Sequence, residues 1–187
     1  MLNNFSLESV SKNKKYLLFI AFFQIICLAL MLVNSSLPIY FGKEVLLKVV
    51  PVDPRSLFRG NYVILNYDFS RFSSKKLIET PNRKLMRGTA IYVKLKKIND
   101  TYTIDRASLS PFKEGIFIKG KLKYPVYFSS DKKRVKNRDI SASFNIEAFF
   151  TNKSKAKQLE LKRNQKKLKA RVFILPNGKA AIDSLIE

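Results

Sequence analysis

The hydrophobic and polar positions divide the chain into one long apolar run and a series of short alternating segments. Residues 16–33 are apolar except for Gln24 and carry no charge. Extended to residue 37, the run reaches the ~20 residues that span the hydrocarbon core of a bilayer. Basic residues precede it, namely Lys12, Lys14 and Lys15. Because basic flanks stay on the cytoplasmic side of a membrane helix, the pattern predicts a cytoplasmic tail over 1–15 and a transmembrane signal-anchor over 16–37.

This orientation predicts a single-pass protein of the bacterial inner (cytoplasmic) membrane whose C-terminal domain is periplasmic or otherwise extracytoplasmic. A cleaved signal peptide is the alternative, because a basic start followed by an apolar stretch fits both. Val33-Asn34-Ser35-Ser36 lacks the Ala-x-Ala pattern of a cleavage site, which favours the uncleaved anchor. Cys27 follows Ile25 and Ile26 rather than the small residues of a lipoprotein signal, so acylation is not expected.

Beyond residue 42, apolar and polar positions alternate in short segments, which is typical of β-strands with one face in a core. Residues 43–50 are the clearest case, with Val45, Leu47 and Val49 on one face. Other strands are expected over residues 62–67, 89–96, 101–105, 114–124, 140–150, 171–175 and 179–186. The pattern predicts a mainly β, β-rich α+β domain over 43–187, built on an antiparallel sheet.

Turn and cap residues separate these strands. Asn99-Asp100 and Pro176-Asn177-Gly178 each predict a hairpin, since they tolerate the positive φ that tight turns need. Gly120 interrupts one strand and predicts a β-bulge. Ser73-Ser74 offers an N-cap for a short helical turn, and a lysine-rich helix with few apolar residues is expected over 154–169.

One stretch, residues 51–67, constrains its own backbone more than any other part of the chain. Pro51 and Pro54 fix φ and push the residue before each of them into extended conformation. Gly60-Asn61 tolerates positive φ, and the strand after it places alternate residues on opposite faces. A stiff loop is therefore predicted to lead into a strand.

Charged residues of this loop are predicted to cluster at the mouth of the strand, namely Asp53, Arg55 and Arg59. A carboxylate between two guanidiniums stays ionised and ties the loop down. Arginine and aromatic side chains dominate interface energies, and a pre-ordered loop loses little freedom on binding. The loop therefore suits recognition of another protein.

The segment Gly60-Asn61-Tyr62-Val63-Ile64-Leu65-Asn66-Tyr67 resembles the signature of the GDYXXLXY protein family, with Asn61 in place of the aspartate. The preceding Pro51-Val52-Asp53-Pro54-Arg55 strengthens the resemblance, and Asn145-Ile146-Glu147-Ala148-Phe149-Phe150 is similar to the family's Gly-Ile-Glu-x-aromatic-aromatic segment. The resemblance covers residues 15–187. Thr151-Asn152-Lys153-Ser154 departs from the family's Val-Pro-Glu-Gly, so both acidic positions have lost their charge.

The resemblance implies an architecture rather than a reaction. Family members tend to be encoded beside, or fused to, multi-pass membrane proteins, which implies a similar companion here. Gln24 would add a hydrogen bond to a neighbouring helix, for ~1 kcal/mol. The expected function is that of a non-enzymatic partner or accessory subunit of a multi-pass integral membrane protein. The candidate binding residues are Asp53, Arg55, Arg59, Asn61, Tyr62, Tyr67 and Glu147.

The charge of the chain adds a second hypothesis. The formal net charge is +22. Most of it lies beyond residue 42, where it favours anionic lipid headgroups, acidic glycopolymers or an acidic partner, and less so in salt. The alternative is compositional, because 26 lysines against 10 arginines, with abundant Asn and Ile, are typical of an AT-rich genome. Nucleic-acid binding is not expected, since the anchor places the basic face outside the cytoplasm.

Catalytic chemistry has few candidate groups. The sequence has no histidine, which excludes histidine-based triads and histidine metal ligands, and its one cysteine lies in the apolar run. Ser56 with Lys94 leaves a Ser/Lys hydrolase open, with a faint similarity to membrane-anchored signal peptidases, although Ser56 is most simply a turn residue. We expect no enzymatic activity, no cofactor and no metal.

Overall fold

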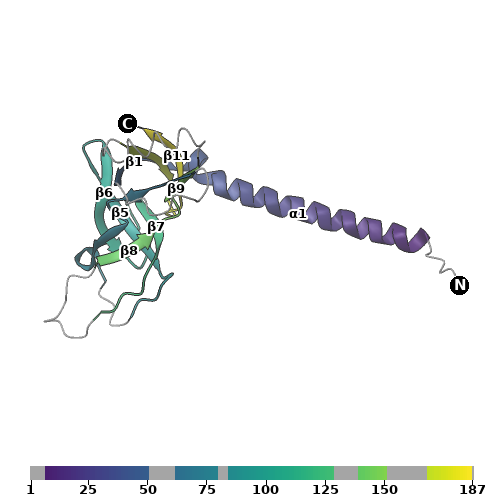
Figure 1. Ribbon diagram of the computed structural model, residues 1–187, viewed down its shortest axis with the longest axis horizontal. Coiled ribbons are helices and arrows are strands. Elements are labelled where there is room, and N and C mark those ends of the chain that lie inside the picture. The colour runs from purple at the N-terminus through teal and green to yellow at the C-terminus, as the bar shows by residue number, and fades with distance from the viewer. Residues whose placement is uncertain (1–6, 51–61, 80–83, 129–138, 151–167, 187) are drawn as a thin grey trace. The chain divides into compact units, whose positions relative to one another are not determined.

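The computed structural model describes residues 7–50, 62–79, 84–128, 139–150 and 168–186, with side chains from residue 14 onward except at Tyr62 and Val63. The chain divides into two compact units, Met1–Leu37 and Pro38–Glu187. The described part of the first unit is helical, and the second is rich in strands (Figure 1). The predicted fold class, mainly β with one N-terminal apolar helix, is confirmed.

Helix α1 spans Leu7–Phe41, and its part from Lys14 to Phe41 is long and apolar enough to cross a membrane. The sequence predicted an end near Pro38, but this proline lies inside the helix. The hydroxyls of Ser35 and Ser36 both donate to the carbonyl of Leu32, at 2.8 and 3.0 Å, so these serines are satisfied within the helix rather than ending it. The helix also begins earlier than the predicted anchor, within the residues predicted as a tail.

The second unit contains a nine-stranded sheet in the order β11-β10-β1-β6-β5-β7-β8-β4, with β3 paired to β1, and a separate two-stranded sheet of β2 and β9. The strands are β1 Lys43–Val50, β2 Tyr62–Ile64, β3 Asn66–Tyr67, β4 Arg71–Ser73, β5 Ala90–Ile98, β6 Thr101–Ser108, β7 Phe117–Leu122, β8 Asp139–Ser143, β9 Ala148–Phe150, β10 Lys169–Ile174 and β11 Ala180–Ile186. A 3-10 helix, η1, spans Ser74–Lys76.

The large sheet is mixed rather than wholly antiparallel. Strands β1 and β6 run parallel, with Leu47 opposite Tyr102, whereas the other paired strands are antiparallel among the described residues. Parallel neighbours need a long connection, and the chain between residues 51 and 100 supplies it. The hairpin of β5 and β6 is thereby inserted beside β1.

The core lies on the face that the alternation predicted. In β1, Val45, Leu47 and Val49 are all buried, as the sequence indicated. The alternate residues of β5, β8 and β10 continue the same core. Its largest fully buried side chains are Phe69, Leu47, Leu65, Ile91, Ile118, Leu122, Ile140, Ile146 and Leu168.

Both predicted hairpins are confirmed. Asn99 has a φ of 53° in the turn between β5 and β6. Gly178 has a φ of 82° in the turn between β10 and β11, where its amide donates to the carbonyl of Leu175 at 2.8 Å. The predicted N-cap is also confirmed, because Ser73 Oγ accepts a hydrogen bond from the amide of Lys75 at the start of η1.

Three local predictions on the strands were wrong. The single strand expected over 62–67 is interrupted at Leu65 into β2 and β3, which pair with different strands. The expected strand over 140–150 is split into β8 and β9, because Asn145 adopts a φ of 61° and turns the chain. Gly120 is not a bulge but pairs regularly with Ile91. A Cβ at Gly120 would lie 2.6 Å from a ring carbon of Phe144, so the glycine makes room for that ring. The predicted helix over 154–169 lies almost wholly outside the described residues, and Lys169 begins β10.

Candidate functional site

The predicted binding loop lies mostly outside the described residues. Asp53, Arg55, Arg59 and Asn61 fall there, so their clustering stays a prediction. Tyr62 is described in its backbone alone and is the first residue of β2. The other two candidates, Tyr67 and Glu147, are described with their side chains.

Strand β2 pairs with β9, and we call these two strands the motif ribbon. Tyr62 lies opposite Phe150, Val63 opposite Phe149 and Ile64 opposite Ala148. The ribbon therefore joins the two segments that carry the family resemblance, although more than 80 residues separate them in sequence.

One face of the motif ribbon is apolar and exposed. Residues opposite each other on paired strands share a face, as do alternate residues along one strand. Ile64, Ala148 and Phe150 lie on this face, with Ile64 39% and Phe150 77% exposed. Phe149, on the other face, packs against the core. The ribbon thus presents hydrophobic side chains to its surroundings while being attached to the core from behind.

Tyr67 is part of that attachment. Its side chain is buried, its hydroxyl donates to the carbonyl of Ile146 at 2.6 Å, and its ring stacks on Phe69. Phe69 in turn meets the ring of Phe144 edge-on, with centroids 5.1 Å apart. Burial and, to a smaller degree, the nearby charge of Glu147 raise the pKa of Tyr67 well above its ordinary value, so its hydroxyl stays protonated as a donor.

Glu147 also accepts hydrogen bonds from backbone amides, through both its side chain and its carbonyl. In the structure its carboxylate accepts a hydrogen bond from the amide of Phe144 at 2.6 Å. Its carbonyl accepts another from the amide of Leu65, just after β2, at 2.8 Å. Tyr67 and Glu147 are thus brought together as supports of the link between β8 and the motif ribbon.

A second candidate site lies where strand β7 contacts the turn of the β10–β11 hairpin. Strand β8 pairs with β7 at Lys121 and Ser143, after which the chain turns away at Asn145. Further along the same edge of β7, the amide of Lys119 donates to the carbonyl of Gly178, in the turn of the β10–β11 hairpin, at 2.8 Å. The edge of β7 therefore changes partner between these two positions.

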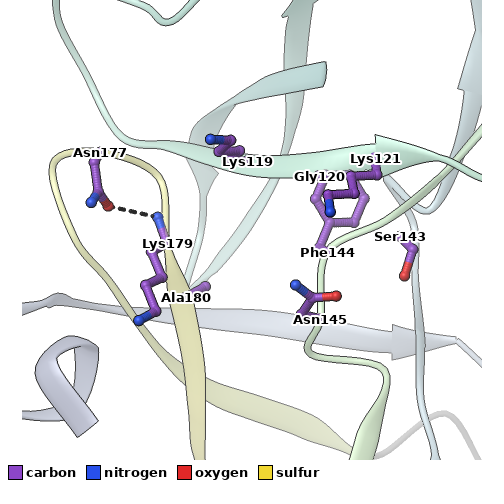
Figure 2. A pocket seen from close by; sticks show the side chains of 9 residues that line it. All are labelled: Lys119, Gly120, Lys121, Ser143, Phe144, Asn145, Asn177, Lys179 and Ala180. Atoms are coloured by element: carbon purple, nitrogen blue, oxygen red, sulfur yellow. Dashed lines mark hydrogen bonds between the residues drawn. The ribbon is translucent and has the colours of Figure 1, made fainter. Parts of the chain in front are cut away.

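A cavity of about 390 Å³ opens at this change of partner, and we call it the seam pocket. Figure 2 shows its lining from β7, from the link after β8 and from the hairpin turn, in which Asn177 Oδ1 accepts a hydrogen bond from the amide of Lys179 at 3.0 Å. The lining residues are Lys119, Gly120, Lys121, Ser143, Phe144, Asn145, Asn177, Lys179 and Ala180.

Sequence reasoning missed this pocket, because its residues come from three separate segments. Residues 114–124 were interpreted only as a strand, and Pro176-Asn177-Gly178 only as a hairpin turn. Gly120, which was interpreted as a bulge, was the one local sign of a close approach.

The structure does not test the Ser56–Lys94 arrangement that the hydrolase alternative requires. Ser56 lies outside them, and Lys94 Nζ lies 5.7 Å from the centroid of the Phe112 ring. Within the described part of the chain, no group of three or more histidine, cysteine, aspartate or glutamate side chains is placed to hold a metal ion.

Comparison with known proteins places the chain in a family. Searches of curated proteins and of solved structures give no significant match. One family model, described as GDYXXLXY protein, matches residues 24–185, which include most of the apolar run and both strands of the motif ribbon. The match covers far more than half of the chain, and the chain therefore belongs to the GDYXXLXY protein family.

Proposed function

We propose that the protein is a non-enzymatic, membrane-anchored accessory subunit that binds a multi-pass membrane protein. In this proposal α1 spans the cytoplasmic membrane with its N-terminus inside, and the strand-rich unit lies on the outer side. The basic residues before the apolar run support this orientation.

The exposed apolar face of the motif ribbon is the observation that carries the proposal. Ile64 and Phe150 are hydrophobic and exposed on this face, so burying them against a partner would be favourable. This face is built from the family's own signature segments, whereas Tyr67 and Glu147 support it from within. Phe150 is an aromatic residue of the kind that is enriched in interface hot spots, and Arg55 and Arg59, which precede β2 in the sequence, add a second residue type of this kind.

Co-purification from membranes in mild detergent tests the proposal. We expect a stoichiometric companion with several membrane spans, whose recovery falls strongly for Phe150→Ser. Tyr124→Ser is the matched control, because Tyr124 is 67% exposed and lies outside the ribbon. Since both side chains are exposed, neither change should alter stability by more than about 0.5 kcal/mol.

Further variants separate the contributions of loop and anchor. Replacing Arg55 and Arg59 with alanine should weaken the complex, and Gln24→Leu should weaken it less. Ser56→Ala should leave the complex and the cellular function intact, whereas loss of function with an intact fold would favour the hydrolase alternative. A protein that purifies alone, with every variant behaving like the wild type, would refute the accessory role.

A further inference from the structure

Another cavity of the strand-rich unit lies at the C-terminal end of α1, and we call it the helix-end pocket. Its volume is about 350 Å³. Phe41 and Lys43 line it from the end of the helix and the start of β1, and residues 115–117 and 174–176 line it from the start of β7 and the end of β10. All of these residues belong to the second compact unit, Pro38–Glu187, so the pocket lies within that unit.

Gly42 fixes the helix end against the sheet. Its amide donates to the carbonyl of Pro38 at 2.8 Å, which closes the last turn of α1. A Cβ at this position would lie 2.9 Å from the amide nitrogen of Ile174, so the glycine allows the chain to pass close to β10. The next residue, Lys43, then pairs with Ile174 as β1 begins. The wall that Phe41 and Lys43 supply is thus held in place by β10.

The length of the apolar segment sets the depth at which this wall lies. The segment that could cross a membrane, Lys14–Phe41, has 28 residues and is about 42 Å long as a helix. A bilayer is about 30 Å thick in its hydrocarbon core and about 40–45 Å thick with its headgroup regions. With α1 in the membrane, Phe41 therefore lies in the headgroup region. Tyr40 beside it is 78% exposed, and tyrosine is enriched at that depth. Because Phe41 also lines the helix-end pocket, the pocket borders the headgroups.

The lining of the helix-end pocket is amphipathic. Six of its eight lining residues are apolar, and one, Lys43, is cationic and exposed. The buried floor consists of Phe117 and Ile174, at 6% and 3% exposure. Glu44, the neighbour of Lys43, is paired with Arg171, with Oε1 and Nε 3.2 Å apart. An apolar floor with one cation suits a ligand that has an apolar chain and an anionic group.

We propose that the helix-end pocket binds one phospholipid of the membrane that α1 crosses. The upper part of an acyl chain covers Phe117 and Ile174, and the phosphate faces Lys43. An acyl chain gains little by leaving the hydrocarbon core, but it shields the apolar floor from water, which is favourable. The long lysine side chain lets its ammonium group reach a phosphate at the interface.

Lipid is the expected occupant because Phe41 places the opening among headgroups, which surround the helix whether or not a protein partner is bound. The inference rests on the proposed membrane location of α1. It uses no residue of the motif ribbon, so the accessory role can fail without it.

Photo-crosslinking tests the inference with the purified full-length protein in nanodiscs of phosphatidylethanolamine and phosphatidylglycerol. A photoreactive phenylalanine analogue replaces Ile116, which lines the pocket, and mass spectrometry detects an added phospholipid. The matched control carries the analogue at Leu109, which is also partly buried against the core but lies outside the lining. A third protein carries it at Leu28, in the apolar run and 66% exposed, and reports the membrane location of α1 separately.

The lipid adduct at Ile116 should exceed that at Leu109 about fivefold or more. If the analogue at Ile116 prevents folding, the same analogue at Leu175, half-buried on another wall of the pocket, replaces it with the same expectation. An adduct at Leu28 with none in the pocket, or equal adducts at the pocket and control positions, would overturn this inference and leave α1 in the membrane. No adduct at Leu28 would refute the membrane location and this inference with it.

The lysine is tested in the same assay. Lys43→Gln should lower the adduct yield at Ile116 about threefold or more, because it removes the charge-assisted contact to the phosphate. Lys48→Gln is the control, since Lys48 is exposed on the same strand but lies outside the lining, and it should leave the yield unchanged. Equal losses in both variants would overturn the phosphate contact assigned to Lys43.

The same analogue in intact membranes separates lipid from protein as the occupant. At Ile116 it should again give a phospholipid adduct. A crosslink to another protein in place of that adduct would overturn the inference, because a partner would then fill the pocket.

Discussion

At the scale of single residues, Tyr67 makes the sharpest prediction. Tyr67→Phe removes the hydroxyl that donates to Ile146 and leaves a buried carbonyl without this donor, which should cost about 1–3 kcal/mol of stability. Denaturant unfolding of the full-length protein in detergent measures the loss. Tyr92→Phe is a suitable control, since Tyr92 lies on the half-exposed face of β5. Equal stability of wild type and Tyr67→Phe would contradict this role.

The pH dependence of stability follows from the same residue. Because the pKa of Tyr67 is raised on folding, the unfolded chain releases this proton at a lower pH than the folded protein does. Its contribution is complete below the ordinary tyrosine pKa of about 10 and is lost as the pH rises above it. Stability should therefore fall above that pH more steeply in the wild type than in Tyr67→Phe. Parallel pH profiles of the two proteins would count against the raised pKa.

Gly120 gives a second prediction at this scale. Gly120→Ala places a Cβ against the ring of Phe144 and should cost about 1–3 kcal/mol through overpacking. In a Phe144→Leu background the same change should cost less, because the ring contact is absent, although the contact at 2.7 Å with the carbonyl oxygen of Ser143 remains. A double-mutant cycle measures this coupling. Additive effects would show that Gly120 is required for another reason.

At the scale of elements, the turn of the β10–β11 hairpin contacts β7 beside the seam pocket. Gly178→Ala puts a Cβ at positive φ, 2.8 Å from the ring of Phe117 and 2.9 Å from the amide nitrogen of Lys119. The turn should therefore lift away from β7, with faster hydrogen exchange at the amide of Lys119. Asn99→Gly, in the other hairpin turn, is the control, since glycine tolerates its φ of 53°. Unchanged hydrogen exchange at Lys119 in Gly178→Ala would show that the contact between the turn and β7 does not depend on this glycine.

The elements also show how far the sequence could predict the fold. The face of β1, the two hairpins and the cap at Ser73 depend on neighbouring residues and were predicted correctly. The parallel pairing of β1 with β6 and the ring of Phe144 over Gly120 depend on contacts between distant segments, which local patterns do not encode. At Pro38 the local rule failed, because the helix continues past the proline for one more turn.

The candidate sites, like the fold, could be predicted only in part from the sequence. Tyr67 and Glu147 could be selected from the sequence because they belong to the motif segments. Their roles as hydrogen-bonding supports became visible only when Ile146 and Phe144 were placed beside them. The seam pocket had no single motif to reveal it, since each of its walls reads as an ordinary strand, link or turn.

At the scale of the whole molecule, the basic start and the apolar run predict the orientation. An alkaline phosphatase fused after Tyr40 should be active, and a fluorescent protein fused there should be dark, because both reporters would lie outside the cytoplasm. A fusion after Ser11 should give the opposite pattern and serves as the control. An inactive phosphatase and a bright fluorescent protein after Tyr40 would contradict the proposed orientation and, with it, the proposed location of the strand-rich unit.

The accessory role is tested most directly by photo-crosslinking from the motif ribbon in intact membranes. A photoreactive phenylalanine analogue in place of Phe150 should crosslink to one multi-pass membrane protein, because this exposed side chain lies on the apolar face that the partner is proposed to cover. The same analogue in place of Tyr124, at comparable exposure, should not. A ribbon that crosslinks only to lipid, or to the same proteins as position 124, would contradict the accessory role.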